Sequence, residues 1–200
     1  MYPKRLVCDY ECATNGTFVI RFLYFLQTTA SFGYDGLVQD KLYEKTIKRA
    51  FNILSAKPRS ISEMRTRLLE KEWATAEIVE RVITRLCELE YLDDEKFAVQ
   101  FANSKLITKP LGSSRLRRDL QRKKLSSTVI TKALENVYTE KPEDELIEIA
   151  LTKRLRLKGK PTTREESKKL FDYLLRLGFK YDLVIRRVRD AGKVDVDEEN

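Results

Sequence analysis

One pattern of apolar residues occurs three times in tandem along the chain. In each copy the apolar residues stand at offsets of 0, 4, 9, 14 and 18 from the first. The three copies are Met64, Leu68, Trp73, Ile78 and Val82; Leu116, Leu120, Leu125, Ile130 and Leu134; and Leu170, Leu174, Phe179, Val184 and Val188. Successive copies begin 52 and 54 residues apart, which indicates a structural repeat.

Each copy predicts two helices with a break between them, because offsets 0 and 4 share one helix face and offsets 14 and 18 share another. A further amphipathic stretch precedes each copy, at residues 47–54, 97–102 and 146–150. Residues that favour helix starts stand at the expected places: Ser60 with Glu63, Gly112 with Ser113 and Ser114, Thr163 with Glu166, and Thr75 and Ser127 for the following helices. Each repeat is therefore predicted to contain three helices.

Repeats of this kind contact mainly their neighbours, so we expect an all-α fold in which three tandem three-helix repeats form an elongated, curved array. The predicted repeats span residues 41–92, 93–140 and 141–192, with an acidic tail at 193–200. Residues 1–40 form a separate N-terminal extension, in which Asn15 and Gly16 are typical of a tight turn. We expect a small β-hairpin there, with residues 6–13 paired to residues 17–24.

Composition argues against most catalytic chemistry. The chain has no histidine, which removes the commonest general base and the commonest metal ligand, and neither glycine-rich nucleotide-binding motif occurs. The three cysteines lack the spacing of a zinc site. The acidic residues 93–95 stand where a helix should begin, so we interpret them as caps rather than metal ligands. We expect a protein that is not an enzyme and that needs no cofactor or metal.

The sequence also predicts a location. Its longest apolar run, residues 18–26, contains Arg21 and is too short to span a membrane. Asp9 and Glu11 precede this run, unlike the layout of a secretory signal peptide. An odd number of cysteines without a disulfide framework suits a reducing compartment. We therefore expect a cytoplasmic protein without a membrane partner.

Positive charge is the second marked feature. The formal net charge is +8, which favours binding to phosphates or to acidic proteins. The first 40 residues hold three basic and four acidic side chains, so the excess lies in the repeats. The candidate binding residues form three clusters: Arg115, Arg117, Arg118, Arg122, Lys123 and Lys124; Lys153, Arg154, Arg156, Lys158 and Lys160; and Arg186, Arg187 and Arg189.

Simpler interpretations stand beside this one. Arg115, Arg118 and Arg122 share one helix face, and a solvated face would look the same. Cations at the end of a helix stabilise it through its dipole by about 0.3–1 kcal/mol each, although the second cluster exceeds what capping requires. Trp73 shares its repeat position with Phe179, so we expect it in the core rather than stacked on a nucleic-acid base.

Five short stretches occur in a distinctive order: Ala50-Phe51-x-x-Leu54; Arg59-Ser60 with Leu68; Tyr91-Leu92-Asp93-Asp94-x-x-Phe97-Ala98; Leu111-Gly112-x-x-Arg115-Leu116-x-x-x-Leu120; and Tyr173-Leu174-Leu175-x-x-Gly178-Phe179. Together they resemble the bacterial RecX regulatory proteins over residues 46–190. The resemblance does not reach the first 40 residues. Glycine is usual in the family between the second and third helices of a repeat, where this chain has Glu72 and Lys124 and keeps only Gly178.

The resemblance implies a modulator of the RecA recombinase that binds RecA and its filament on single-stranded DNA. Such proteins limit filament growth and depress strand exchange and the ATPase, within DNA repair, recombination and the SOS response. We expect a monomer whose basic clusters contact RecA, with single-stranded DNA as a further candidate partner. Two alternatives remain open: a DNA-binding regulator of helix-turn-helix type, and a helical-repeat scaffold for an acidic protein.

Overall fold

The computed structural model describes residues 38–192, and within that range every regular element is a helix. A first helix covers residues 38–56. It is followed by α2 (Ile61–Leu69), α3 (Ala76–Glu88), α4 (Asp94–Thr108), α5 (Ser113–Gln121), α6 (Ser127–Glu140), α7 (Glu143–Lys158), α8 (Arg164–Arg176) and α9 (Tyr181–Gly192). The predicted all-α fold is confirmed, whereas the predicted hairpin and acidic tail lie outside the described residues.

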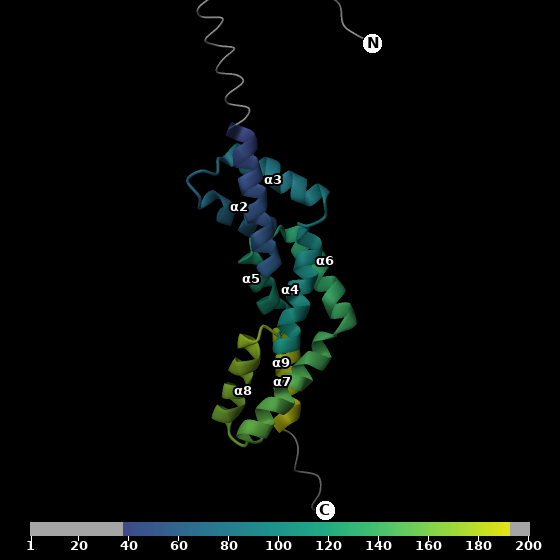
Figure 1. Ribbon diagram of the computed structural model, residues 1–200. Helices are drawn as coiled ribbons and strands as arrows, with labels where there is room; N and C mark the ends of the chain where they lie inside the picture. Colours follow the sequence, from purple (N-terminus) through teal and green to yellow (C-terminus); the bar gives the residue numbers. More distant parts are fainter. Residues whose placement is uncertain (1–37, 193–200) are drawn as a thin grey trace, which may run out of the picture.

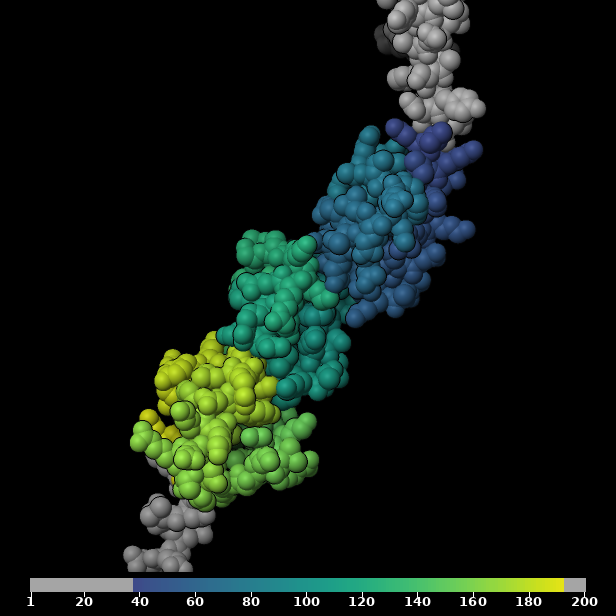
Figure 2. Space-filling model, turned by 90° about the vertical axis from the view of Figure 1, so that its left-hand side faces the viewer, coloured from purple at the N-terminus to yellow at the C-terminus, as the bar shows by residue number. Residues whose placement is uncertain are grey.

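The helices are arranged in threes along the long axis of the molecule (Figure 1). We call the first helix with α2 and α3 unit 1, helices α4 to α6 unit 2, and helices α7 to α9 unit 3. In the space-filling view the three units follow one another from the purple and blue end to the yellow end (Figure 2). The array is elongated, as the repeat pattern predicts.

Side-chain caps explain where several helices begin. The hydroxyl of Ser60 accepts a hydrogen bond from the backbone N–H of Glu63, and Thr163 and Glu166 form a reciprocal capping box. Asp93 caps α4 in the same way, which confirms its predicted role. The predicted cap of α6 was one residue out, because Ser126 rather than Ser127 accepts from the N–H of Val129.

The apolar repeat positions form the core. All of them are buried except Trp73 and Val188, which are partly buried. The expectation that Trp73 lies in the core is therefore wrong in part: its ring packs against the core of unit 1, while the ammonium group of Lys45 lies 4.3 Å from its centroid. The buried residues of unit 1 form one cluster, and those of units 2 and 3 form another. Units 2 and 3 thus share a core from which unit 1 is separate.

Units 2 and 3 also meet backbone to backbone. The N–H of Gly112 donates to the carbonyl of Leu177 at 2.9 Å, and the N–H of Ser114 donates to the carbonyl of Gly178 at 3.1 Å. A Cβ atom on Gly112 would overlap the backbone of Gly178. Gly178 has φ of +88°, a conformation that side chains disfavour. Glycine at both positions is therefore required by this close approach.

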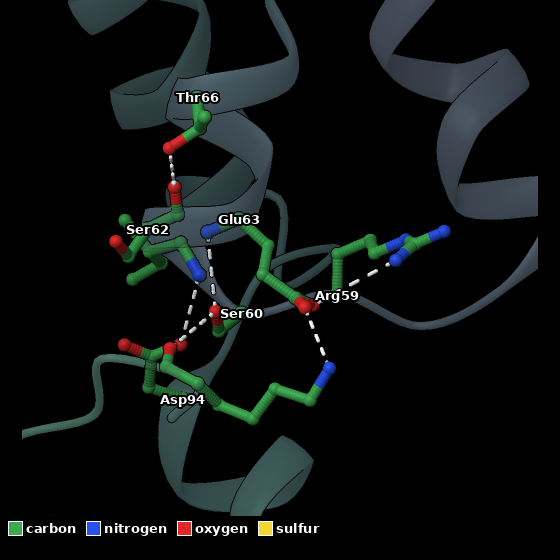
Figure 3. A network of polar contacts seen from close by, with 8 residues as sticks. Arg59, Ser60, Ser62, Glu63, Thr66 and Asp94 are labelled. Atoms are coloured by element: carbon green, nitrogen blue, oxygen red, sulfur yellow. Dashed lines mark hydrogen bonds and ion pairs between the residues drawn. The ribbon is translucent and has the colours of Figure 1, made fainter. Parts of the chain in front are cut away.

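Units 1 and 2 are joined by polar contacts instead, shown in part in Figure 3. The hydroxyl of Ser60 donates to the carbonyl of Lys123 at 2.9 Å, and the N–H of Ile61 donates to Asp94 Oδ1 at 2.9 Å. The ammonium group of Lys123 lies 2.6 Å from Glu63 Oε1. Burial raises the pKa of Glu63, but the hydrogen bond and charge of Lys123, with smaller contributions from the charge of Arg59 and a backbone hydrogen bond at Ser60, together hold this pKa below its ordinary value. The joint is thus a set of hydrogen bonds and one ion pair.

Candidate interaction surface

The central basic strip lies on α5, at the middle of the array. Arg115 and Arg122 lie 3.6 and 3.5 Å from the carboxylate of Asp119, which they share. Arg118 is exposed, and its Nε donates to the carbonyl of Ser114 in its own helix. One carboxylate against three guanidinium groups leaves the strip positively charged.

The other residues of this predicted cluster have different surroundings. The guanidinium of Arg117 is partly buried and donates to Thr131 Oγ1 at 3.4 Å. Lys123 is paired with Glu63 at the joint between units 1 and 2. Lys124 is exposed. The predicted cluster therefore combines residues that hold the structure together with exposed cations that have no such role. Lys123 is mainly of the first kind, because it is paired with Glu63.

The second cluster lies at the end of α7 and is mostly exposed. Arg154 is partly buried, with its guanidinium 4.9 Å from the centroid of the Tyr173 ring. Arg154, Lys158 and Lys160 line a hollow of about 340 Å³ together with Lys169 of α8. Among the described residues, none of the five predicted cations of this cluster has a carboxylate within 4.0 Å. Their charge is therefore open to a partner.

The third cluster, on α9, is divided. Arg187 lies 3.2 Å from Asp144 and 2.9 Å from Glu148, so it ties α9 to α7 within unit 3. Arg186 and Arg189 are exposed. Of this group, only those two present open charge on the surface.

Three basic residues that were not predicted join the surface of unit 2. Lys105 and Lys109, at the end of α4, and Arg176, at the end of α8, line one hollow of about 490 Å³ with Arg115 and Tyr173. No run of basic residues marks them in the sequence, because they stand apart in the chain. Only the packing of α4, α5 and α8 brings them together.

The described part of the chain has no cluster of metal-ligating side chains, and none of its helices is both long and apolar enough to cross a bilayer.

The phenol of Tyr138 is a largely buried polar group with a structural hydrogen bond. Burial and, to a lesser extent, the charge of Glu143 raise the pKa of Tyr138, and its hydroxyl donates to the carbonyl of Leu111 at 2.9 Å. This group stays protonated and holds the segment before α5 against α6 within unit 2.

Two family models match the chain. The model of the first three-helix domain of RecX matches residues 47–86, and that of the second three-helix domain matches residues 93–134. These stretches lie in units 1 and 2.

Proteins named regulatory protein RecX are similar over most of the chain. The one from Finegoldia magna is 32% identical over 151 residues, which are 75% of this chain and 73% of that protein. The one from Bacillus subtilis is 31% identical over 156 residues, 78% of this chain and 58% of that protein, and the one from Leuconostoc mesenteroides is 26% identical over 159 residues, 78% and 59%. The match thus spans less than two thirds of the latter two relatives.

Solved structures show the same fold. The crystal structure of RecX from Lactobacillus salivarius has a TM-score of 0.68 at 21% identity and covers 76% of this chain and 97% of its own. A second RecX crystal structure also has a TM-score of 0.68, at 22% identity, and covers 78% of this chain and 76% of its own. The repeated helices, the matching domain models and the identity to the Finegoldia protein agree, and the chain belongs to the RecX family of regulatory proteins.

Proposed function

We propose that this protein binds the RecA recombinase and its filament on single-stranded DNA, and that it lowers filament growth, strand exchange and the DNA-dependent ATPase. The observation that carries the proposal is the basic strip of α5, which sits at the middle of an elongated array in a member of a family of regulatory proteins. A filament offers a long, repetitive surface, which an elongated array can follow over more than one subunit.

In this proposal the protein acts by binding rather than by catalysis. Arg118 and the two arginines that share Asp119 lie on the outer side of α5, at the middle of the array. When the array lies in a groove of the filament, the filament contacts these arginines from both sides. Contacts of this kind with phosphates or carboxylates depend on charge, so inhibition should weaken as salt rises.

The test is a titration of the RecA ATPase on single-stranded DNA with wild-type protein and two sets of variants. The first set replaces Arg115, Arg118 and Arg122 by Ala. The comparison set replaces Arg81 and Arg85 of α3, where Arg85 is paired with Glu88 at 3.0 Å and Arg81 lies over the Tyr43 ring. We expect near-stoichiometric wild-type protein to lower the ATPase rate, and the first set to lose more inhibition than the second.

Three results would count against all or part of this assignment. An ATPase rate that stays constant across the titration would remove the RecA proposal. Equal loss from both sets would leave RecA as the partner and reject only the choice of surface. High-affinity, sequence-specific binding to duplex DNA, without any effect on RecA, would favour a helix-turn-helix regulator instead.

A further inference from the structure

A small basic hollow lies at the joint between units 1 and 2, beside the polar contacts of Figure 3. Its volume is about 280 Å³. Its lining comes from the segment before α2, from α2 itself and from the turn after α5: Arg59, Ser62, Glu63, Thr66, Arg67, Glu70, Arg122, Lys123 and Lys124. None of these residues lines the hollow of Arg115 and Arg176. The joint therefore has a depression of its own, to which both units contribute.

Positive charge predominates in this joint hollow, because five cations and two carboxylates line it. One carboxylate, Glu63, is held by the ammonium group of Lys123 at 2.6 Å. The other, Glu70, is exposed at the end of α2. Within residues 38–192, Arg67 and Lys124 have no carboxylate within 4.0 Å. The joint hollow is thus suited to an anion with several negative charges.

Arg59 has an unused hydrogen-bond donor in the wall of the joint hollow. Its guanidinium lies 3.9 Å from the carboxylate of Glu63, but its Nε atom is buried and has no acceptor among the described residues. A buried donor without an acceptor is costly in free energy. An anion bound in the joint hollow would supply an acceptor for this group.

Lys124 has a backbone conformation that disfavours lysine. Its φ is +56°, and at the corresponding position of unit 3 the chain has Gly178, with φ of +88°. Glu90 is the other described residue with a side chain and positive φ, and it is paired with Lys96 at 2.7 Å. Strained residues of this kind cluster at binding sites. What the side chain of Lys124 adds at this position is a positive charge in the joint hollow.

The lining favours a short chain of phosphates over a nucleic acid or an acidic peptide. None of the described residues that line the joint hollow is aromatic, so bases have no ring on which to stack. The small volume suits a compact ligand whose charges are close together, whereas the carboxylates of a peptide are spread along its chain. Guanidinium groups bind phosphate oxygens in pairs, and the hydroxyl of Ser62 adds a neutral donor.

We propose that the joint hollow binds an oligophosphate, either inorganic or the phosphate chain of a nucleotide. Arg59 and Arg67 hold it from unit 1, and Arg122 and Lys124 hold it from unit 2. Because both units hold the ligand, it fastens unit 1 to unit 2 and stabilises the joint. The binding needs neither RecA nor DNA, so it goes beyond the proposed function and does not depend on it.

The test is urea denaturation of the full chain, followed by the fluorescence of Trp73. This residue is the only tryptophan of the chain and packs on the core of unit 1. We expect millimolar tripolyphosphate to raise the midpoint of the transition above that in sodium chloride of equal ionic strength, because a ligand of the folded joint stabilises it. ATP without magnesium distinguishes the two sources of the chain: a rise with tripolyphosphate alone would restrict the site to inorganic oligophosphates.

Lys124→Gly separates binding from structure, because it removes a cation and relieves the backbone at the same time. Without ligand its midpoint should equal or exceed that of wild type. Its rise in tripolyphosphate should fall to about half of the wild-type rise or less, since a quarter to a half of the open charge is lost. Lys124→Arg keeps the charge and should keep the full rise.

Arg67→Gln tests the contribution of unit 1 and should also lose about half of the rise or more. Its matched control is Lys48→Gln, which removes one positive charge from an exposed residue of the same unit outside the joint hollow. This control should respond to tripolyphosphate as the wild type does.

Three outcomes would overturn the proposal: no rise beyond that in chloride, an equal rise in wild type, Lys124→Gly and Arg67→Gln, or a larger rise with oligo(dT) at the same phosphate concentration. The last would assign the joint hollow to nucleic acid. None of these results bears on the RecA ATPase titration, so failure of this proposal and failure of the proposed function are distinguishable.

Discussion

Gly112 shows how a single residue can determine the junction of two units. It precedes α5 and provides no side chain to cap that helix. Instead, the carboxylate of Glu143, from unit 3, accepts from the N–H of Ser113 at 2.7 Å. The first turn of α5 is therefore completed by a residue thirty positions away, and the same junction carries the backbone hydrogen bonds to Leu177 and Gly178.

We expect Gly112→Ala to lower the free energy of unfolding by about 3 kcal/mol or more. Gly112 has φ of −81°, which any residue adopts, so the loss would come from the overlap of the new Cβ with the backbone of Gly178 and Phe179. Backbone atoms cannot move aside as a flexible side chain can. Urea denaturation followed by circular dichroism measures the change.

Gly192→Ala is the control for this substitution, because a Cβ there would meet nothing within 4 Å. Alanine at that helical position should be neutral or stabilising by up to about 1 kcal/mol. If Gly112→Ala proved as stable as Gly192→Ala, the close approach of the two backbones would not exist in solution.

The limits of sequence reasoning also appear at this scale. Ser60, Thr75 and Thr163 were predictable as caps because each acts on a backbone N–H three residues away. Glu143 and Lys123 were not, because their partners lie 30 and 60 residues distant. Lys123 was grouped with the binding cations for the same reason, since nothing in its local sequence reveals Glu63.

Among the elements, α5 has the most varied role. One face buries Leu116 and Leu120 in the core shared by units 2 and 3. Its N-terminus lies against unit 3, and the residues just after its C-terminus contact unit 1 through Lys123. The arginines of its outer face are held between these two junctions. The periodicity of the sequence predicted the buried face, whereas the two junctions depend on contacts between distant segments.

Because unit 1 has a core of its own and a polar joint, we expect it to unfold before units 2 and 3. Trp73, the only tryptophan of the chain, packs on the core of unit 1. Its fluorescence should therefore report unit 1, while far-ultraviolet circular dichroism reports all units. In urea the fluorescence transition should have a lower midpoint than the main dichroism transition. Coincident midpoints would show that the three units unfold together.

Acid provides a specific check of this joint. The pKa of Glu63 is lowered in the folded protein, so its contribution is complete above the ordinary value of 4.5 and is lost as the pH falls through the lowered pKa. Burial raises the pKa of Asp94 at the same joint, so the contribution of Asp94 to stability increases as the pH falls, which is opposite to that of Glu63. At neutral pH, Glu63→Gln should lower the midpoint of the fluorescence transition, which corresponds to a loss of about 1 kcal/mol in the free energy of unfolding of unit 1. This difference from wild type should vanish in acid. A constant difference would exclude the pair as the cause.

For the molecule as a whole, the number and order of the units and the basic strip of α5 could be predicted from the sequence, but the other cations that line the hollows of unit 2 could not. The repeats are visible because each core position recurs at a fixed spacing. Two adjacent hollows are lined by Lys57 of unit 1, Lys105 of unit 2 and Arg176 of unit 3, which share no local pattern. These residues come together only because the units pack end to end.

The division of the core leads to a prediction about the whole array. A fragment that starts at Asp93 should fold as a helical protein, because units 2 and 3 keep one continuous core and the glycine junction, and about 100 residues suffice for a stable domain. Removing unit 1 takes away Lys57 and the contacts at Lys123, but leaves Arg115, Arg118 and Arg122 in place. We therefore expect the fragment still to inhibit the RecA ATPase, but more weakly than the full chain does. Circular dichroism checks the folding and the ATPase titration checks the activity; a folded fragment with undiminished inhibition would show that the length of the array is not what the partner recognises.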